Sequence, residues 1–124
     1  MSVLLDSVIL IDHLNGHAAA TDYLRSLGNT NISVITRAEV LAGLTPDAVD
    51  PVSRLLDRYP ALPIDLEIAD MAAGLRRLNQ WKLPDAFQAA LAMKHGLKLA
   101  TRNIRDFSPQ KHAFVVVPYR LPTR

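Results

Sequence analysis

The sequence predicts an α/β fold with a central parallel sheet, and three observations lead to this prediction. Short apolar runs alternate with longer segments of helical periodicity along the 124 residues, as in successive βα units. The first run, Val3-Leu4-Leu5, is apolar at every position, which is typical of a strand covered on both faces. Polar residues, acids among them, follow these runs, where a parallel sheet presents the carboxyl ends of its strands.

Five strands are expected, each a short apolar or β-branched run bounded by polar residues or turn signals. They cover residues 3–5, 32–35, 62–64, 97–101 and 114–117. Pro63 weakens the third of them, because a proline cannot donate a hydrogen bond to a neighbouring strand.

Six helices are expected, from apolar residues that recur at intervals of three and four. They cover residues 7–14, 18–27, 36–44, 50–59, 66–81 and 84–95. Thr36 opens the third helix and Thr45-Pro46 ends it. Pro84 fits the first turn of the last helix, and Gly96 stops that helix directly after His95.

Length and composition indicate one domain over residues 1–124, with a loosely attached tail from about residue 118, where Pro118 and Pro122 follow the last strand. An apolar share of 49% supplies a hydrophobic core, and no segment has the roughly 20 apolar residues that span a bilayer. The absence of cysteine excludes disulfides and thiolate zinc sites. With no basic leader before the first acid, we expect a cytoplasmic protein. Its net charge of +2 permits contact with nucleic acid without requiring it.

Four acids stand near junctions between a strand or loop and a helix: Asp6, Glu39, Asp85 and Asp106. Such junctions share one edge of a parallel sheet, so the four carboxylates are expected to gather there. At a separation of about 5 Å and an effective dielectric near 20, each pair repels by roughly 3 kcal/mol. Protonation or a bound divalent cation relieves that repulsion, and the second option predicts a metal-dependent enzyme.

Each of these acids also has a purely structural explanation. Asp6 is a candidate helix N-cap, and Thr36-x-x-Glu39 is a capping-box pattern. Asp85 in a first helical turn complements the helix dipole, and Asp106 is a candidate cap of the turn that follows it. Their shared edge favours the functional interpretation. The other eight acids are interpreted as solvated charge: Asp12, Asp22, Asp47, Asp50, Asp57, Asp65, Glu67 and Asp70.

Other motifs are weaker. The four histidines are scattered, and the chain lacks a Walker A loop, a G-x-S-x-G elbow and a G-x-G-x-x-G turn. Trp81 is interpreted as a core residue. A group of basic residues flanks the third and fourth acids and is either ordinary surface or a phosphate-binding surface: Arg76, Arg77, Lys82, Arg102 and Arg105.

Four segments, in order, resemble the motifs of PIN domains. They are Leu-Leu-Asp-Ser-Val-Ile-Leu-Ile-Asp, Ser-Val-Ile-Thr-Arg-Ala-Glu-Val-Leu-Ala-Gly-Leu, Leu-Pro-Asp-Ala-Phe-Gln-Ala-Ala-Leu-Ala and Leu-Ala-Thr-Arg-Asn-Ile-Arg-Asp-Phe. The length is similar to that of the VapC-type toxins, the stand-alone PIN ribonucleases of toxin–antitoxin modules. The resemblance spans residues 3 to about 117 and implies a three-layer α/β/α PIN-like domain.

By this resemblance, Asp6, Glu39 and Asp85 are catalytic residues and ligands of Mg²⁺, with Mn²⁺ as a substitute. Asn103 and Asp106 are expected to line the same site, with Asp106 a fourth catalytic residue and a direct or a water-mediated ligand of the metal. A second set is expected to support the metal site or hold the RNA backbone: Ser7, Thr101, Arg102, Asn103 and Arg105. Val8 departs from the polar residue that is more usual in the family's first motif.

The resemblance further implies hydrolysis of RNA phosphodiesters by a metal-activated water, in a toxin that a VapB-type antitoxin restrains. A homodimer is expected, with DNA bound only through the antitoxin. The small and apolar residues at 40–44 and 55–56 are candidates for these contacts, or for core packing. Two alternatives remain open: a non-catalytic PIN-fold binding module, and a phosphoacceptor receiver domain. The receiver class expects adjacent acids after the first strand, where Asp6 stands alone.

Overall fold

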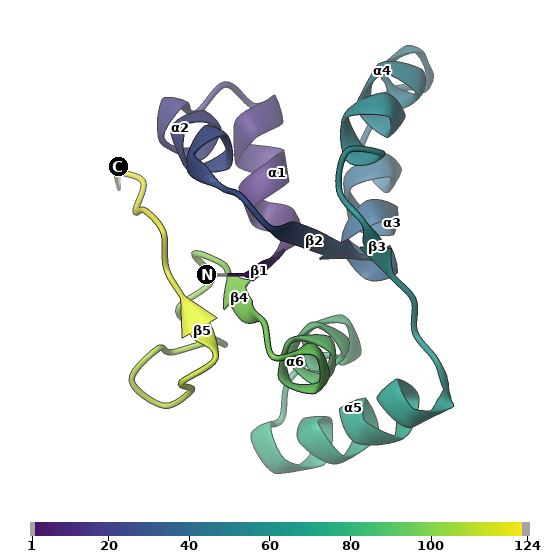
Figure 1. The fold of residues 1–124 in the computed structure, drawn as a ribbon, viewed down its shortest axis with the longest axis vertical. Helices are drawn as coiled ribbons and strands as arrows, with labels where there is room; N and C mark the ends of the chain where they lie inside the picture. Colours follow the sequence, from purple (N-terminus) through teal and green to yellow (C-terminus); the bar gives the residue numbers. More distant parts are fainter. Residues whose placement is uncertain (1, 123–124) are drawn as a thin grey trace.

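A computed structural model of the chain describes residues 2–122. Its centre is one sheet of five parallel strands in the order β3-β2-β1-β4-β5 (Figure 1). The strands are β1 (Val3–Leu5), β2 (Thr30–Ser33), β3 (Ala61–Leu62), β4 (Lys98–Ala100) and β5 (Val115–Val116). This order differs from the 2-1-3-4-5 order of receiver domains, so the structure does not support the receiver alternative.

Six helices cover the two faces of the sheet, which gives the predicted three layers (Figure 1). They are α1 (Ser7–Leu14), α2 (Ala18–Ser26), α3 (Val34–Ala42), α4 (Pro46–Leu56), α5 (Leu66–Asn79) and α6 (Leu83–His95). The first four lie on one face, and α5 and α6 pack together on the other. None of the helices within residues 2–122 has the length and apolar character to cross a membrane.

Alternation along the buried strands explains why both faces are covered. Val3 and Leu5 belong to the core beneath α1–α4, whereas Leu4, between them, belongs to the core beneath α5 and α6. Neighbouring β4 repeats the pattern, with Leu99 on the second face and Ala100 on the first. Successive side chains of a strand point to opposite faces, so a wholly apolar run requires two covering layers.

The boundary between β2 and α3 lies two residues earlier than predicted. The sequence pattern extends the strand over 32–35 and starts the helix at Thr36, but Ser33 is the N-cap and its hydroxyl accepts from the backbone N–H of Thr36 at 3.0 Å. Val34 and Ile35 are therefore the first residues of the helix. The predicted Thr36 capping box is wrong, and Glu39 is the sixth residue of α3 and not its third.

The second difference concerns α4, which begins at Pro46, where the sequence analysis places a boundary. Proline at the first helical position loses no helical hydrogen bond and has a suitable φ, so Pro46 starts a helix as readily as it ends one. Pro51 lies inside the same helix, where it removes one backbone hydrogen bond. The sequence pattern predicts a start near Pro51 because proline is tolerated best in the first turn of a helix.

No helix lies between β4 and β5; residues 101–114 form turns. Trp81 and Phe107 are buried, and their tilted rings pack with centroids 5.1 Å apart. This contact attaches the loop to the core beneath α5 and α6 and confirms the core prediction for Trp81. Asp106 thus lies in a turn and not at a helix start. Beyond β5, the hydroxyl of Tyr119 donates to Asp12 at 2.7 Å, so the expected loose tail is anchored at least as far as this residue.

Candidate active site at the carboxyl edge of the sheet

The candidate site lies at the carboxyl ends of β1 and β4, the two strands between which the chain changes direction across the sheet. From β1 the chain continues to β2 and β3 on one side, and β4 and β5 occupy the other. Ligands of open α/β sheets bind at such a switch point. A cavity of about 460 Å³ opens there. It is lined by Asp6, Ser7, Val8, Glu39, Asp85, Arg102, Asn103, Ile104 and Arg105.

Asp6 is the fixed element of this cavity. It follows β1 directly and is the N-cap of α1, with its Oδ1 accepting from the backbone N–H of Ser7 at 2.9 Å. Its Oδ2 accepts from the hydroxyl of Thr101, at the end of β4, at 2.6 Å. Only 7% of Asp6 is exposed, and burial raises its pKa although these hydrogen bonds oppose the rise. The capping and functional interpretations therefore apply to the same carboxylate.

Glu39 from α3 and Asp85 from the first turn of α6 face the same cavity. Burial raises the pKa of Asp85 to about 6, and the nearby carboxylates of Asp6, Asp106 and Glu39 add to the rise. Loss of solvent also raises the pKa of Glu39, with a further contribution from Asp6. The structure thus brings Asp6, Glu39 and Asp85 together at one cavity, with Asp106 near enough to contribute to the raised pKa of Asp85.

Behind the acids lies a buried polar group that the sequence analysis missed. Gln88, one turn after Asp85 in α6, donates through Nε2 to the hydroxyl of Thr36 at 2.6 Å and weakly to Asp6 Oδ1 at 3.5 Å. Thr36 in turn donates to the backbone carbonyl of Leu5, at the end of β1, at 3.1 Å. These bonds connect α6, α3 and β1 behind the cavity. The only sequence feature that points to this buried group is a glutamine within an Ala-rich helix.

We expect Thr36→Val to lower the free energy of unfolding by about 1–3 kcal/mol, because it leaves the carbonyl of Leu5 and the amide of Gln88 buried without this partner. Valine has nearly the same shape, so the loss reports the hydrogen bonds and not the packing. Urea unfolding measures it. Thr36→Ser, which keeps the hydroxyl and its hydrogen bonds and removes only a methyl group, is the control and should destabilise less.

Asn103 and Asp106 occupy different places relative to the cavity. The backbone N–H of Asn103 donates to the hydroxyl of Thr101 at 3.0 Å, which brings this residue into the cavity lining. Its side-chain amide donates to Asp106 Oδ2 at 3.0 Å. Asp106 itself lines a neighbouring cavity, and its backbone carbonyl accepts from the indole N–H of Trp81 at 2.8 Å. Asp106 is therefore at the rim of the site, connected to it through Asn103.

The interpretation of Asp12 as solvated charge is wrong. Only 2% of Asp12 is exposed, and its two carboxylate oxygens accept from Arg102 Nε at 2.6 Å and Nη2 at 2.8 Å. Burial alone would raise the pKa of Asp12, but the hydrogen bonds from Arg102 and Tyr119 hold it below its ordinary value. Arg102, expected to hold the RNA backbone, is thus already engaged in a bidentate ion pair.

The oxygen donors of the cavity fit a hard divalent cation. Its acids offer carboxylate oxygens, and neither histidine nor cysteine lines it, which suits Mg²⁺ or Mn²⁺ better than zinc. Within residues 2–122, no three His, Asp or Glu side chains are arranged to hold one ion directly between them. Mg²⁺ usually binds through one or two carboxylates and keeps several waters, and the cavity has room for these waters.

Comparisons with known proteins bear on the family and the fold of the chain. A family model described as PIN domain matches residues 3–109. The chain is 36% identical over 113 residues to Ribonuclease VapC10 of Mycobacterium tuberculosis (strain H37Rv), covering 85% of each protein. A toxin–antitoxin complex from Klebsiella pneumoniae contains a chain that is 35% identical, with a TM-score of 0.88, and the match covers 97% of this chain and 100% of that one. FitAcB from Neisseria gonorrhoeae is 25% identical with a TM-score of 0.78, and the match covers 96% of this chain and 99% of that one.

Proposed function

The chain belongs to the PIN-domain family, with VapC ribonucleases among its relatives, and we propose that it is a metal-dependent endoribonuclease, the toxin of a type II toxin–antitoxin system. The observation that carries the proposal is the convergence of Asp6, Glu39 and Asp85 on one cavity at the switch point of the sheet. Identity of about 35% to a VapC ribonuclease and to a toxin–antitoxin chain supports the reaction and the biological role.

In this proposal, Asp6, Glu39 and Asp85 would hold Mg²⁺, or Mn²⁺ in its place, through one or two direct carboxylate contacts and otherwise through waters of the ion. The ion supplies an activated water for phosphodiester hydrolysis and neutralises charge at the phosphate. The protein's own contribution is to fix the carboxylates. Thr101 donates to Asp6 Oδ2 and the backbone N–H of Ser7 donates to Oδ1, so the start of α1 and the residue after β4 together set the orientation of Asp6.

Arg105 is the cation available to the RNA at this cavity. Arg102 also lines it, but its charge is compensated by Asp12, whereas Arg105 is exposed and forms no ion pair within residues 2–122. An unpaired guanidinium binds a phosphate through two parallel hydrogen bonds. We therefore assign the contact with the RNA backbone mainly to Arg105.

The protein partner in this proposal is an antitoxin that restrains the nuclease. A mainly apolar cavity beside the acids is lined by Ile11, Leu14, Leu44 and also Glu39. Ile11 and Leu14 are 37% and 38% exposed, so a partner helix that covers them would lie against the metal-binding acids. DNA binding then belongs to the antitoxin.

Homodimer formation and a cytoplasmic location stay predictions. Leu56 is wholly buried in the core and is not available for such contacts.

The test is cleavage of labelled RNA by the purified protein with Mg²⁺ or Mn²⁺ and with EDTA, beside Asp6→Asn. We expect metal-dependent fragments that disappear with EDTA and in the variant. Asparagine keeps the shape and the capping oxygen of Asp6, so a folded, inactive variant points to the carboxylate itself. Fragments that persist in Asp6→Asn would place the chemistry elsewhere. Intact RNA in every sample, from folded protein with bound metal, would instead support the non-catalytic PIN module.

A further inference from the structure

A second cavity adjoins the candidate active site, and the two share a wall at Arg105. Its volume is about 370 Å³, within the range of small-ligand cavities, about 300–1,000 Å³. Seven of its lining residues carry polar or charged side chains that face solvent at least in part: Asn79, Gln80, Arg105, Asp106, Ser108, Lys111 and His112. Neither the metal-binding acids nor the antitoxin proposal makes use of this cavity.

Charge distinguishes the two cavities. The active-site cavity contains three acids, and only Arg105 among its cations lacks an acidic partner. The second cavity contains Arg105 and Lys111, neither of which forms an ion pair within residues 2–122, against the single carboxylate of Asp106. That carboxylate is turned toward Asn103, whose amide donates to it at 3.0 Å. The first cavity therefore needs a bound cation before it can accept an anionic chain, whereas the second attracts such a chain without one.

The walls of the second cavity are fixed before any ligand binds. The ring of His112 lies against Trp81 with centroids 5.0 Å apart, and Trp81 is held by its indole bond to Asp106 and by Arg76, which donates to the carbonyl of Trp81 at 2.8 Å. The backbone N–H of His112 donates to the carbonyl of Ser108 at 3.0 Å. A cavity with fixed walls binds its ligand at a lower cost in lost flexibility.

From this arrangement we propose that the second cavity is a subsite for the RNA strand, taking the nucleotide next to the cleaved phosphodiester, with its phosphate on Arg105 and Lys111. The proposal rests on the proposed nuclease function and adds the path of the strand. Asn79, Gln80 and Ser108 offer hydrogen bonds to a base edge or a ribose hydroxyl. Because the subsite lies on one side of the metal-binding acids, it binds the strand on one side of the cut only.

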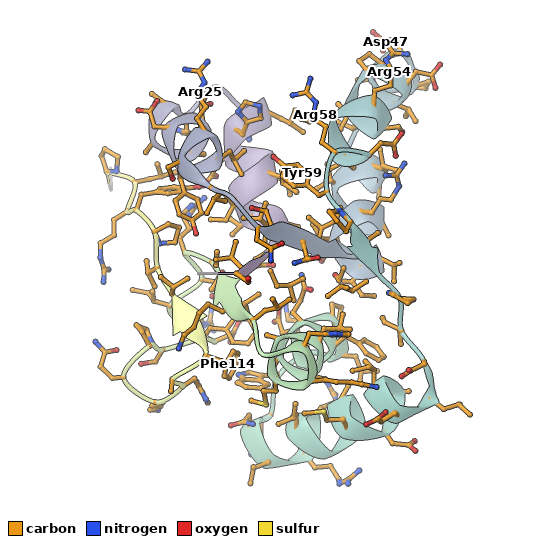
Figure 2. All side chains as sticks on the ribbon, viewed as in Figure 1. Arg25, Asp47, Arg54, Arg58, Tyr59 and Phe114 are labelled. Atoms are coloured by element: carbon orange, nitrogen blue, oxygen red, sulfur yellow. The ribbon has the colours of Figure 1, made fainter. Side chains whose placement is uncertain are left out.

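Binding of a short labelled single-stranded RNA, followed by fluorescence anisotropy in EDTA at several salt concentrations, tests the contacts. We expect Lys111→Gln to raise Kd by about 3- to 10-fold and to reduce the slope of log Kd against log salt by about 1. Arg105→Gln should act in the same direction. The control is Arg54→Gln, which removes the same charge from an exposed site on α4 and should leave Kd unchanged. Phe114 packs against His112, which lines the second cavity, and Arg54 lies far from Phe114 (Figure 2).

Cleavage of RNAs shortened from either end tests the position of the subsite. We expect wild-type kcat/KM to fall by about 10-fold when the strand is shortened on one side of the cut, and Lys111→Gln to abolish most of that difference. The subsite would be overturned if shortening the RNA from either end lowered kcat/KM equally. It would also be overturned if Lys111→Gln and Arg105→Gln bound RNA with the same Kd as Arg54→Gln. In both cases, cleavage by the wild type would leave the nuclease proposal intact. Loss of antitoxin binding alone in these variants would also overturn the subsite. A wild-type protein that neither binds nor cuts RNA would remove both proposals together.

Discussion

Replacing Asp85 by asparagine is expected to abolish RNA cleavage and, at the same time, to stabilise the metal-free protein. The carboxylate is a proposed metal ligand, and its loss removes several kcal/mol of transition-state stabilisation, on the order of a thousandfold in rate. Without metal, the same carboxylate is partly buried beside Asp6, Asp106 and Glu39, which raises its pKa to about 6. Asparagine removes that repulsion while keeping the size of the side chain.

The stability gain has a defined pH dependence. A carboxyl group whose pKa is higher in the folded than in the unfolded chain contributes stability when it is protonated, and loses that contribution as the pH rises. For Asp85 the loss falls between about pH 4 and pH 6. The variant should therefore match the wild type below pH 4 and exceed it at pH 7, by about 1 kcal/mol after allowance for solvent screening.

Urea unfolding in EDTA at pH 4 and pH 7, with RNA cleavage in Mg²⁺, measures both effects. Asp70→Asn is the matched control, since Asp70 is exposed on α5 and forms no ion pair within residues 2–122; it should change neither quantity. Mg²⁺ should stabilise the wild type by binding the folded state, and the Asp85 variant much less. A variant that cleaves RNA normally would exclude Asp85 from the metal site, and one that is less stable at pH 7 would contradict the described clustering of acids.

The sequence predicts the sheet and its helices well because their signals are local and repeated. The wholly apolar run at 3–5 has no other low-energy place than between two layers, and the structure puts it at the centre of the sheet. Boundaries are less predictable. Ser33 and Thr36 both have side chains that cap helices, and only the packed structure shows that Thr36 instead donates to Leu5 across the core.

The same division holds at the site. The positions of Asp6, Glu39 and Asp85 follow from the geometry of parallel sheets, because the ends of the strands share one edge. Gln88 and Asp12 could not be found in this way. Gln88 contacts Thr36, 52 residues away in the chain, and Asp12 contacts Arg102, 90 residues away. Neither the spacing nor the composition of the sequence indicates such a pairing. An acid on the first helix is therefore interpreted as solvated until its partner is seen.

Replacing Asp12 by asparagine is expected to lower the free energy of unfolding by about 2 kcal/mol. The carboxylate is almost wholly buried and accepts from Arg102 twice and from Tyr119 once. Breaking a fully buried ion pair from one side costs about 3–5 kcal/mol. Arg102 is 34% exposed and can turn to water, which reduces the loss. The same substitution also weakens the attachment of the segment after β5, because the hydroxyl of Tyr119 then has a neutral acceptor in place of a charged one.

Urea unfolding at pH 7 of Asp12→Asn, Arg102→Gln and the double variant separates the pair from its members. Arg102→Gln should destabilise at least as much as Asp12→Asn, because it leaves a buried carboxylate with Tyr119 as its remaining side-chain partner. The double variant should lose less than the sum of the two. Asp22→Asn, an exposed acid on α2, is the matched control and should be neutral. Additive losses would mean that the bidentate contact contributes nothing to stability.

The same variants decide which arginine serves the RNA. In the structure, Arg102 is committed to Asp12, so a folded Arg102→Gln protein should bind RNA only slightly more weakly, whereas Arg105→Gln should lose several-fold. Releasing Arg102 through Asp12→Asn leaves an unpaired guanidinium at the rim of the acidic cavity, where it would attract phosphate, and RNA should bind that variant no more weakly than the wild type. Strong loss of RNA binding in Arg102→Gln, with normal stability, would reverse the assignment. Asp12 would then be a residue that positions the arginine for the substrate, and not one that holds the fold together.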